Sequence, residues 1–534
     1  MNRELLLQHF HRISEAPDAI SRLRRFILDL AVRGKLVEQD PSDEPATELL
    51  KRIKVTSSCV PDDLQFKMPS GWSAVRFGDV YSLEYGSNLP AEKRTNTGEY
   101  PVYGSNGVVG SHFECFVKSP CIVVGRKGSA GALNLSVTEG CCVTDVAYYC
   151  IPSEGLDMDF SFKLFHTIGL DTLGKGVKPG LSRKEAYVLP LAIPPLAEQQ
   201  RIVAKVDELM ALCDQLEAER NQREAHRDKL VAASLNRIST TTAEEAKDAA
   251  HFHLNLLPRL TTTPEHIKQL RQTILNLAVR GRLVEQDPDD EPAGELLKRA
   301  TAAKALLMIE KGIKREKDVE YSDSIDEAIA PEHWCWAHVA DVALIQGGKR
   351  LPAGAVFSKE KTPHIYIRVT DMKDGTIRTD NPQYITSEVQ RAIARYTINK
   401  EDLYITIAGT IGQVGIVPAP LDGQNLTENA AKLVFREINA DFLVMALSSE
   451  AVQLQFQDKT KQMAQPKLAL KRVAGARIPL PPLAEQQRIV AKVDQLMGLC
   501  DQLEAQLTTT KADSRRLLEA VLNDALKISI VAEG

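Results

Sequence analysis

The chain has 534 residues, of which 43% are hydrophobic and 26% charged, a composition typical of globular proteins with several domains. No apolar run is long enough to span a bilayer, and the nine cysteines include no CxxC pair, so the sequence argues against a membrane span and a cysteine metal site. Scattered thiols and an amphipathic N-terminus indicate a cytoplasmic protein. The net charge of −5 excludes a uniformly basic surface, so any affinity for nucleic acid must come from local patches or from partners.

An internal duplication dominates the sequence. Residues 194–218 (PPLAEQQRIVAKVDELMALCDQLEA) recur 287 positions later at 481–505 with two substitutions. Residues 30–52 recur almost as closely at 277–299. Two near-identical frames suggest two copies of one docking surface.

The segments inside the frames differ from each other. We call residues 61–193 insert 1 and residues 331–480 insert 2. Insert 1 carries 12 Lys and Arg against 14 Asp and Glu, whereas insert 2 carries 18 against 15. Different inserts in similar frames suggest two different recognition tasks.

In chain order, the first predicted elements are two helices ahead of insert 1. One apolar face is followed by Gly34, which is placed to cap a helix C-terminus. Asp43 and Pro45 then predict an N-cap and a first-turn proline for a second helix. The second frame repeats both features with Gly281, Asp290 and Pro292. The apolar faces consist of Leu23, Ile27, Leu30 and Ala31, and of Leu270, Ile274, Leu277 and Ala278.

Both inserts are predicted to be β-rich α/β domains. Short runs rich in Val, Ile, Tyr and Gly alternate with turns, as in PCIVVGRKGSAGALNLSV of insert 1 and DLYITIAGTIGQVGIV of insert 2. A helical piece follows near the end of each insert, at 159–167 and at 440–456.

Each PPLAEQQ segment predicts the start of a long helix, because prolines end the preceding strand and good helix formers follow. Apolar residues then recur at alternating spacings of four and three, which is a heptad seam. The helices continue to about Asn236 and Asn523, roughly 60 Å each. One alternative is an amphipathic helix on a globular core, but the length favours two long helices packed on each other. The predicted helix-pairing residues are Ile202, Val206 and Leu209 in one seam and Ile489, Val493 and Leu496 in the other.

The fold class predicted is therefore mixed α/β, with two β-rich α/β domains separated by long antiparallel coiled-coil helices and a pseudo-two-fold internal repeat. A polar stretch at 239–263 is expected to link the halves, and a charged stretch at 310–327 could extend the helix before insert 2. The expected divisions are a helical region at 1–60, insert 1 at 61–193, a long helix at 194–238, a linker with a second helical region at 239–330, insert 2 at 331–480, and a second long helix with the C-terminal tail at 481–534.

Enzyme signatures are absent from the sequence. There is no GxxxxGK[ST] phosphate loop and no Asn-Pro-Pro-aromatic motif of an amino-methyltransferase; Asn381-Pro382-Gln383 is the nearest match. GTIGQVG at 409–415 lies between two strand-like runs, so tight β-turns explain it better than a nucleotide loop. We expect neither a catalytic residue nor a metal site in this chain.

Candidate DNA contacts come from the placement of charge and glycine. A basic, proline-containing segment precedes each long helix and is free of acids in both halves, which favours phosphate contacts over a merely solvated loop. The turn Arg126-Lys127-Gly128-Ser129 of insert 1, aligned with Gly409-Thr410-Ile411-Gly412 of insert 2, allows close backbone approach, and Arg is the usual reader of guanine edges. The predicted DNA-binding residues are Arg126, Lys127, Ser129, Lys175, Lys178, Arg183, Lys349, Arg350, Thr410, Gln413, Lys467 and Lys471.

Taken together, these motifs resemble one family over essentially the whole chain. The twin PPLAEQQRI segments and runs such as YPVYGSNGVVG (100–110), VVGRKGSAG (123–131) and IAGTIGQVGIV (407–417) are similar to the specificity subunits of type I restriction–modification systems. The helical repeat ahead of each insert resembles the subfamily in which such a region precedes the first target-recognition domain.

The resemblance implies a non-catalytic reader of double-stranded DNA. Each insert would read one half of a split, asymmetric site, and the long helices would set the distance between the halves. Two modification subunits, which bind S-adenosylmethionine, would dock on the repeated helical regions. Restriction subunits, which use ATP and Mg²⁺, would join them, leaving this chain without a cofactor. The alternatives are a stand-alone DNA methyltransferase or nuclease, and a coiled-coil scaffold that binds protein.

Overall fold

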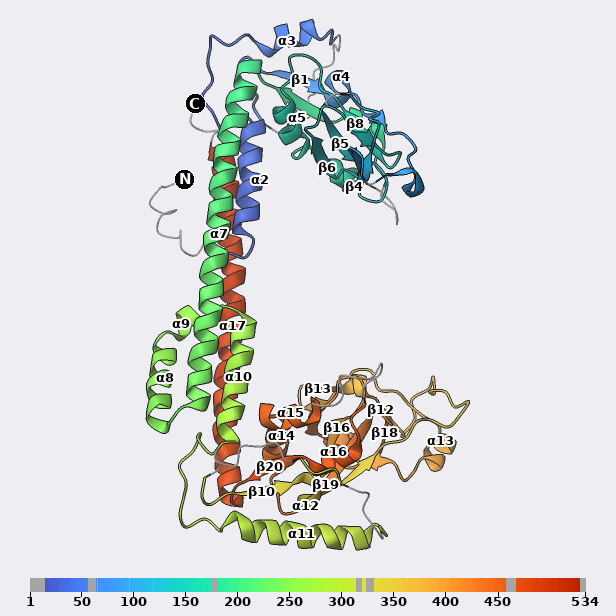
Figure 1. Cartoon of the computed structure of the whole chain (residues 1–534), viewed down its shortest axis with the longest axis vertical. Coiled ribbons are helices and arrows are strands. Elements are labelled where there is room, and N and C mark those ends of the chain that lie inside the picture. The colour runs from blue at the N-terminus through green and yellow to red at the C-terminus, as the bar shows by residue number, and fades with distance from the viewer. Residues whose placement is uncertain are drawn as a thin grey trace. The chain divides into compact units, whose positions relative to one another are not determined.

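The structure is a computed structural model of the whole chain. It describes residues 15–55, 64, 66–95, 97–118, 120–174, 180–313, 319–322, 331–457 and 467–528. Its ribbon combines β-rich inserts with long helices (Figure 1). None of the helices described in it is long and apolar enough to cross a membrane.

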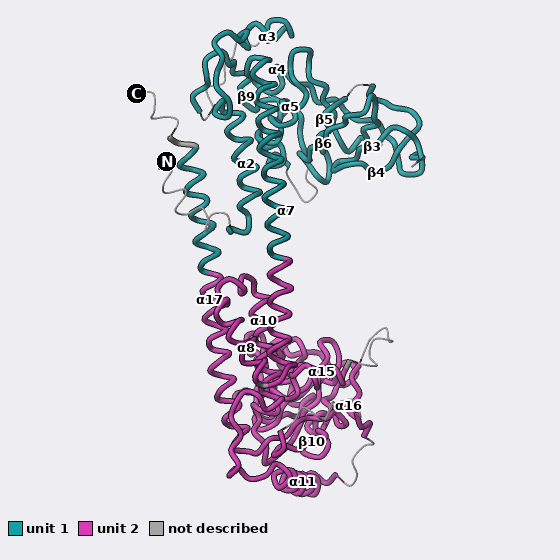
Figure 2. The backbone as a smooth tube through the Cα atoms, turned by 60° about the vertical axis from the view of Figure 1, so that its left-hand side comes forward, with its two compact units in different colours: residues 1–224, 509–534 teal, residues 225–508 magenta. Residues whose placement is uncertain are grey.

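The chain forms two compact units that are not continuous in sequence. Unit 1 comprises residues 1–224 and 509–534, and unit 2 comprises residues 225–508 (Figure 2). The long helices α7 (Leu196–Thr240) and α17 (Leu483–Ile528) each contribute residues to both units. Each unit therefore contains the start of one long helix, which we call its head, and the end of the other, which we call its tail.

Short helices precede each insert as predicted. Helix α2 ends just before Gly34 and α10 ends just before Gly281, and both glycines adopt the left-handed conformation, with φ of +64° and +65°. The bounds are α2 Ala19–Val32, α3 Ala46–Arg52, α8 Ala243–Asn255, α9 Leu257–Leu260, α10 Pro264–Ala278 and α11 Ala293–Glu310.

The described residues of insert 1 form three small sheets, with strand orders β2-β8-β5-β6, β4-β3-β7 and β1-β9. Its largest apolar core joins the sheets β1-β9 and β2-β8-β5-β6 to α2, α5 and the head of α7. The bounds are β1 Ser73–Arg76, α4 Phe77–Val80, β2 Glu84–Tyr85, η1 Ala91–Lys93, β3 Tyr100–Gly104, β4 Gly107–His112, β5 Cys121–Gly125, β6 Leu133–Ser136, β7 Cys142–Val143, β8 Ala147–Cys150, α5 Met158–Phe165, η2 Leu170–Leu173, α6 Arg183–Tyr187 and β9 Pro190–Ile193.

In its described part, insert 2 has sheets β11-β19-β16-β17 and β10-β20 that correspond to two of these, together with the sheet β12-β18-β15, in which β18 rather than β12 is central, and the hairpin β13-β14. The bounds are β10 Cys335–His338, α12 Val339–Val342, β11 Ala343–Gly347, β12 Tyr366–Ile367, η4 Val369–Asp371, β13 Met372–Lys373, β14 Thr376–Ile377, α13 Ser387–Ala392, β15 Thr397–Ile398, β16 Leu403–Thr406, β17 Val414–Ile416, η5 Ala419–Leu421, β18 Gln424–Leu426, β19 Ala430–Phe435, α14 Ala440–Ser448, α15 Glu450–Gln457, α16 Leu470–Gly475 and β20 Arg477–Leu480.

The two inserts are attached to their frames in the same way. Strand β1 enters insert 1 and pairs antiparallel with the exiting strand β9, Ser73 opposite Ile193. Strand β10 pairs with β20 in the same register, Cys335 opposite Leu480. The long helix begins three residues after each exiting strand. The predicted fold class is thus confirmed as mixed α/β with two β-rich regions and long helices.

The predicted partner of each heptad seam is wrong. Ile202 and Val206 share a core with Ile27 and Ala31 of α2, and Leu209 packs against this core. Ile489 and Val493 share a different core with Ile267, Ile274 and Ala278 of α10, and Leu496 packs against that one. No residue of one seam belongs to the core that contains the other. The apolar faces of α2 and α10 have the same residue spacing as the seams that they cover, and each lies in the same unit as its seam. No motif in the sequence identifies these faces as the partners of the seams.

The tails of the long helices also pack on these short helices. In unit 1, Leu518 of α17 is buried with Ala16 and Ala19 at the start of α2. In unit 2, Val231 and Leu235 of α7 are buried with α8 and α9 residues, and Leu270 and Leu277 of α10 pack against them. Helices α2 and α10 thus each bind the head of one long helix and the tail of the other.

Three further predictions on the helical regions need correction. The stretch 239–263 is not an open linker, because α8 and α9 fold back on the tail of α7 through Ala249 and Leu260. Helix α11 ends at Glu310, followed by Gly312 at φ +64°, so the charged stretch does not extend it. The predicted helical piece at 440–456 is two helices, α14 and α15, interrupted at Ser449.

Candidate nucleic-acid interface

A buried polar clasp holds insert 1 on the head of α7. The carboxylate of Glu198 is 1% exposed and accepts hydrogen bonds from Trp72 Nε1 (2.9 Å) at the base of insert 1 and from Gln39 Nε2 (2.7 Å). Burial raises the pKa of Glu198, although these two hydrogen bonds act in the opposite direction. Gln199 Oε1 accepts from the backbone N–H of Asp157, the N-cap residue of α5. The repeated EQQ segment therefore binds both the insert and the preceding helical region.

Unit 2 repeats the clasp atom for atom. Glu485 accepts from Trp334 Nε1 (2.9 Å) and Gln286 Nε2 (2.5 Å), and burial raises its pKa in the same way. Gln486 accepts from the backbone N–H of Asn439, the N-cap residue of α14. Because the two clasps are equivalent, each insert is held on its long helix in the same way.

The predicted N-caps at Asp43 and Asp290 are wrong, because both carboxylates belong to this clasp region. Pro45 and Pro292 occupy the N-cap positions of α3 and α11, without a side-chain cap. Asp43 is bound by both terminal nitrogens of Arg201, at 3.2 and 2.6 Å, and Asp290 by Arg488 at the same two distances. Bidentate pairing to a nearly buried carboxylate gives a stronger and more directional contact than a helix cap.

The glycine turn of insert 1 joins β5 to β6 and presents Arg126 and Lys127. Gly128 (φ +85°) and Gly131 (φ +78°) permit the turn, and Lys127 bridges to Gly180. Lys127 is exposed and Ser129 half-buried, whereas Arg126 donates from Nη1 to the carbonyl of Asp145 (2.9 Å). The Arg126 side chain is therefore held in place and Lys127 projects into solvent.

An exposed tyrosine lies beside both predicted arginines of insert 1. The guanidinium carbon of Arg126 lies 4.8 Å from the ring centre of Tyr85, and that of Arg183 lies 4.3 Å from the same ring. Arg183 also donates to the carbonyl of Leu83 (3.0 Å). Tyr148 packs against Tyr85 at 5.2 Å, and Tyr85 remains 49% exposed. We call Tyr85, Arg126, Tyr148 and Arg183 the Arg–Tyr platform.

The matching turn of insert 2 joins β16 to β17, but its predicted alignment is two residues out of register. The backbone N–H groups of Ile407 and Ala408 both donate to the carbonyl of Asn429. Those of Arg126 and Lys127 both donate to the carbonyl of Val146, so Ile407 corresponds to Arg126. Gly409 (φ +82°) and Gly412 (φ +85°) then correspond to Gly128 and Gly131. The predicted residues Thr410 and Gln413 are both exposed in this turn.

Insert 2 has a cavity where insert 1 has its platform. Sheet pairing makes Gly347 and Ala431 equivalent to Tyr85 and Tyr148, and the 287-residue repeat makes Leu470 equivalent to Arg183. Small and apolar residues thus replace two rings and two guanidinium groups. The resulting cavity measures about 970 Å³ and is lined by Gly347, Ile407 and Leu470 among others.

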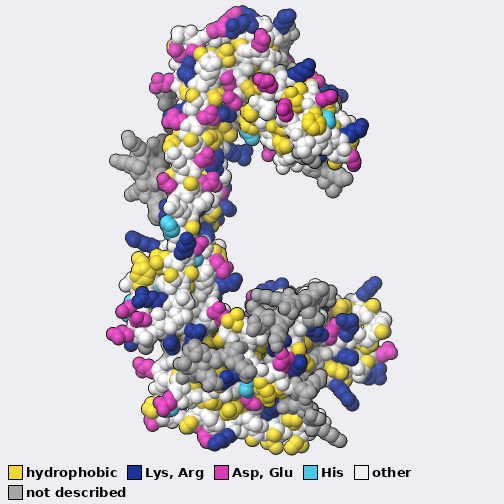
Figure 3. All heavy atoms as spheres, in the orientation of Figure 1, with side chains coloured by type: hydrophobic (Ala, Val, Ile, Leu, Met, Phe, Trp, Pro, Cys, Tyr) yellow, Lys and Arg dark blue, Asp and Glu magenta, His cyan; other side chains and the backbone are white. Residues whose placement is uncertain are grey.

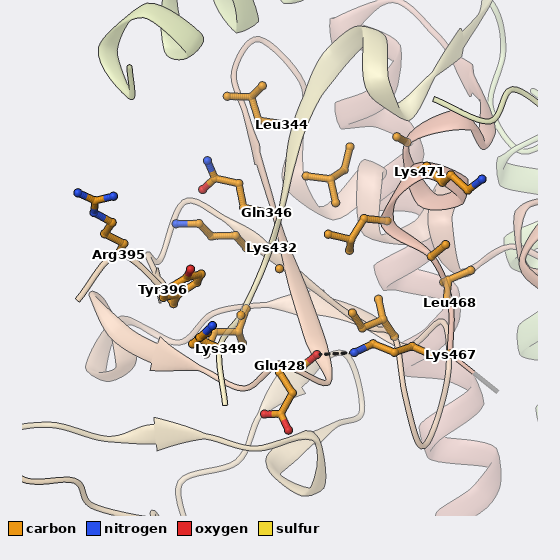
Figure 4. Close-up of a pocket in the computed structure, with 18 of the residues that line it drawn as sticks. Leu344, Gln346, Lys349, Arg395, Tyr396, Glu428, Lys432, Lys467, Leu468 and Lys471 are labelled. Carbon is orange, nitrogen blue, oxygen red and sulfur yellow. Dashed lines mark hydrogen bonds between the residues drawn. The ribbon is translucent and has the colours of Figure 1, made fainter. Parts of the chain in front are cut away.

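The remaining predicted residues of insert 2 line this cavity. The Nζ of Lys349 lies 5.7 Å from the ring centre of Tyr396, and Arg350 pairs with Glu428 at 2.8 Å. Lys467 donates to the carbonyl of Glu428 (3.3 Å), and Lys471 pairs with Glu320 at 3.1 Å. Figure 4 shows Lys349 beside Tyr396, with Lys467 on the other side of Glu428.

Lys175 and Lys178 lie outside the described residues, so they stay predictions. On the face shown in Figure 3, Lys and Arg side chains are interspersed with Asp and Glu over both units. This agrees with local patches rather than one continuous basic surface. Within the described ranges, no cluster of three His, Cys, Asp or Glu side chains could hold a metal ion.

Sequence reasoning missed the aromatic members of both sites. Tyr85 and Tyr148 lie in strands, and Tyr396 lies in a loop far from the basic segments in sequence. Arg395, which also lines the cavity, was missed for the same reason. A tyrosine in a strand usually indicates packing, so only the pairing of the strands could have brought it beside an arginine.

Comparison with known proteins identifies the family. The sequence model of one protein family, the type I restriction modification DNA specificity domain, matches residues 69–223 and 331–510, which is more than half of the chain. The chain belongs to this family. It is the DNA specificity subunit of a type I restriction–modification system, a subunit that is not itself catalytic.

Relatives of this specificity subunit span nearly its whole length. The EcoEI specificity subunit of Escherichia coli is 26% identical, and the EcoAI subunit of the same organism is 27% identical; each match covers 95% of this chain and 94% of the relative. Among solved structures, the HsdS subunit from Thermoanaerobacter tengcongensis is 17% identical, with a TM-score of 0.39 over 86% of this chain and 98% of that one. A chain from a type I system studied for complex assembly is 18% identical, with a TM-score of 0.49 over the same shares.

Proposed function

We propose that this specificity subunit reads a bipartite, asymmetric DNA site, with one half-site for each insert. The supporting observation is that two equivalent clasps hold two inserts whose exposed surfaces differ. Equivalent attachment would give each insert the same relation to its long helix. The Arg–Tyr platform and the cavity, lying at equivalent positions, would then meet different bases.

We assign base contacts to the glycine turns and phosphate contacts to the exposed lysines. In insert 1, Arg126 is held over Tyr85, so its guanidinium can meet a base edge without first losing much side-chain entropy. Lys127 and Lys467 are exposed and suit phosphate contacts, as we expect for Lys175 and Lys178. In insert 2, Thr410 and Gln413 offer exposed hydrogen-bonding groups in place of the arginine.

Membership of the family supports a proposal on the partners. We propose that two modification subunits carry S-adenosylmethionine and dock on the repeated helical regions, and that restriction subunits use ATP and Mg²⁺. Two nearly identical helix heads, of α7 and α17, each pack on a short helix with apolar residues at the same spacing, α2 and α10, and this supports two equivalent docking surfaces. We further expect the length of α7 and α17, which contribute to both units, to fix the unread spacer.

The test is a methylation map made with the full chain and its modification subunit. We expect adenine methylation at one asymmetric split sequence, and DNA binding that weakens linearly in log–log form as salt rises. Methylation at a continuous site, or by the chain without its partner, would contradict the proposal.

A further inference from the structure

The cavity of insert 2 has the dimensions of a small-molecule site. Its volume of about 970 Å³ lies near the upper end of the range of such sites, roughly 300–1,000 Å³. It opens where insert 1 is filled by Tyr85, Arg126 and Arg183, so the equivalent space is occupied in the other half of the molecule.

One wall of the cavity is apolar. It is formed by Leu344, Ile407 and Leu470, with Gly347 leaving room beside Leu470. Leu344 and Ile407 are each 3% exposed, so the wall is fixed by the core of insert 2. A flat apolar group could therefore be buried against it.

The other walls carry an excess of positive charge. Six lining residues are Lys or Arg and one, Glu428, is acidic. Three of the cations are neutralised nearby: Arg350 by Glu428 (2.8 Å), Lys471 by Glu320 (3.1 Å) and Lys432 by the buried Asp402 (3.7 Å). For the other three, Lys349, Arg395 and Lys467, the described parts of the chain contain no carboxylate within 4.0 Å.

Aromatic and amide groups lie between the apolar wall and these cations. Tyr396 faces Lys349, and the side chains of Gln346 and Lys432 point to the same side (Figure 4). An aromatic ring of a ligand could stack on Tyr396, and the polar groups at the edge of that ring could form hydrogen bonds with Gln346. Lys432 is fixed, since its Nζ donates to the carbonyl of Thr397 (2.6 Å).

We propose that this cavity binds one nucleotide, with the base between Tyr396 and the apolar wall and the phosphate at Lys349 and Arg395, which lie on the same side of Glu428 (Figure 4). A base needs apolar faces and hydrogen bonds at its edge, and a phosphate needs cations without carboxylate partners. The nucleotide could come from solution, or from bound DNA in which one base has left the stack. Only the DNA source rests on the proposed function.

The first experiment uses the full chain without partner subunits and titrates it with AMP, adenosine and inorganic phosphate by calorimetry. We expect AMP to bind at least tenfold more tightly than adenosine or phosphate. Arg395→Ala should weaken AMP binding about tenfold. Gly347→Tyr, which restores the ring found at Tyr85, should abolish it. Lys361→Ala, an exposed change in the same insert, is the matched control and should leave binding unchanged.

The second experiment tests DNA as the source. The complex with the modification subunit is bound to duplexes carrying 2-aminopurine at each position of the second half-site except the methylated adenine. An unstacked base should fluoresce more strongly, and Arg395→Ala should remove the increase. AMP binding alone assigns the cavity to a free nucleotide, and fluorescence alone assigns it to DNA.

Failure of both experiments overturns the inference, as does AMP binding that neither Arg395→Ala nor Gly347→Tyr weakens. If the same preparation still methylates a split site, the proposed function stands and only the nucleotide site is lost. Circular dichroism of both variants shows whether insert 2 remains folded.

Discussion

The two inserts differ most at positions that their frames make equivalent. In insert 1, Tyr85 and Tyr148 support the guanidinium groups of Arg126 and Arg183. In insert 2, the same positions hold Gly, Ala, Ile and Leu, and a cavity opens. None of these side chains takes part in the hydrogen bonds of the clasp, so they can change while those bonds are kept. The DNA sequence that an insert recognises could therefore change while the attachment of that insert to its long helix stays the same.

The largest expected effect comes from the clasps, and it tests whether the two inserts are held equivalently. Trp72→Phe and Trp334→Phe each remove a hydrogen bond to a buried carboxylate, which should cost about 1.5–3 kcal/mol of local unfolding free energy. Because the clasps are equivalent, we expect the two losses to agree within about 0.5 kcal/mol. Hydrogen exchange of each insert measures both. A large loss in one unit with none in the other would show that the frames are not equivalent.

Substitution of Arg126 tests whether insert 1 discriminates bases in the first half-site alone. Arg126→Ala should cost about 1–3 kcal/mol of discrimination at one position of the first half-site, and leave the second half-site unchanged. Binding competition among single-base variants of the site measures this. Lys127→Ala, in the same turn, is the matched control and should weaken all sequences alike. If Arg126→Ala also weakens every sequence equally, Arg126 contacts a phosphate.

Lys467 tests the phosphate contacts of insert 2. Lys467→Ala should reduce the slope of log affinity against log salt by about 0.9, which corresponds to one phosphate. Binding measured from 50 to 200 mM salt gives the slope. An unchanged slope would remove Lys467 from the interface, and Lys361→Ala provides the exposed control.

The tails of the long helices should give the smallest effect. In unit 1, Asp18 and Arg22 of the α2 region pair with Arg515 and Glu519 of α17, at 3.3 and 3.7 Å. In α7 the position equivalent to Arg515 is Asp228, which instead bonds to His266 (2.7 Å). Arg515→Asp should therefore destabilise unit 1 by about 0.2–1 kcal/mol, and adding Asp18→Arg should restore it.

The same tails bear on the pairing of half-chains. A fragment of residues 1–260 contains both the head and the tail of α7, so a second copy could supply the tail that α17 supplies in unit 1. Such a pair would bring Asp228 to the position of Arg515, close to Asp18, which is repulsive. We expect sedimentation to show weak self-association for this fragment and tighter association for its Asp228→Arg variant. Equal association would show that the ion pairs do not select the tail.

The sequence predicted most of the local structure because the signals for it are local. Repeated glycines end α2 and α10, and prolines start α7 and α17 as predicted. The errors concern partners that lie far apart in the chain. Asp43 resembles an N-cap until Arg201 binds it, and the heptad seam resembles a coiled coil until α2 covers it.

The candidate site could be predicted only in part for the same reason. Charge and glycine placement located Arg126, Arg183, Lys349 and Lys467. The register of the two turns depends on strand pairing with β8 and β19, and so does the approach of Tyr85 to Arg126. The cavity arises because small or apolar residues replace two tyrosines and two arginines at four positions. Such replacements form no sequence motif, so the sequence of insert 2 does not predict the cavity.

The most direct test of the account exchanges one insert for the other. Strands β1 and β9 have the same register as β10 and β20, so residues 73–193 can be replaced by residues 335–480 at matched positions. With its modification subunit, this chain would carry insert 2 in both frames. We expect methylation mapping to show an inverted repeat of the second half-site. Methylation of the original asymmetric site by this folded hybrid would contradict the claim that each insert reads its own half.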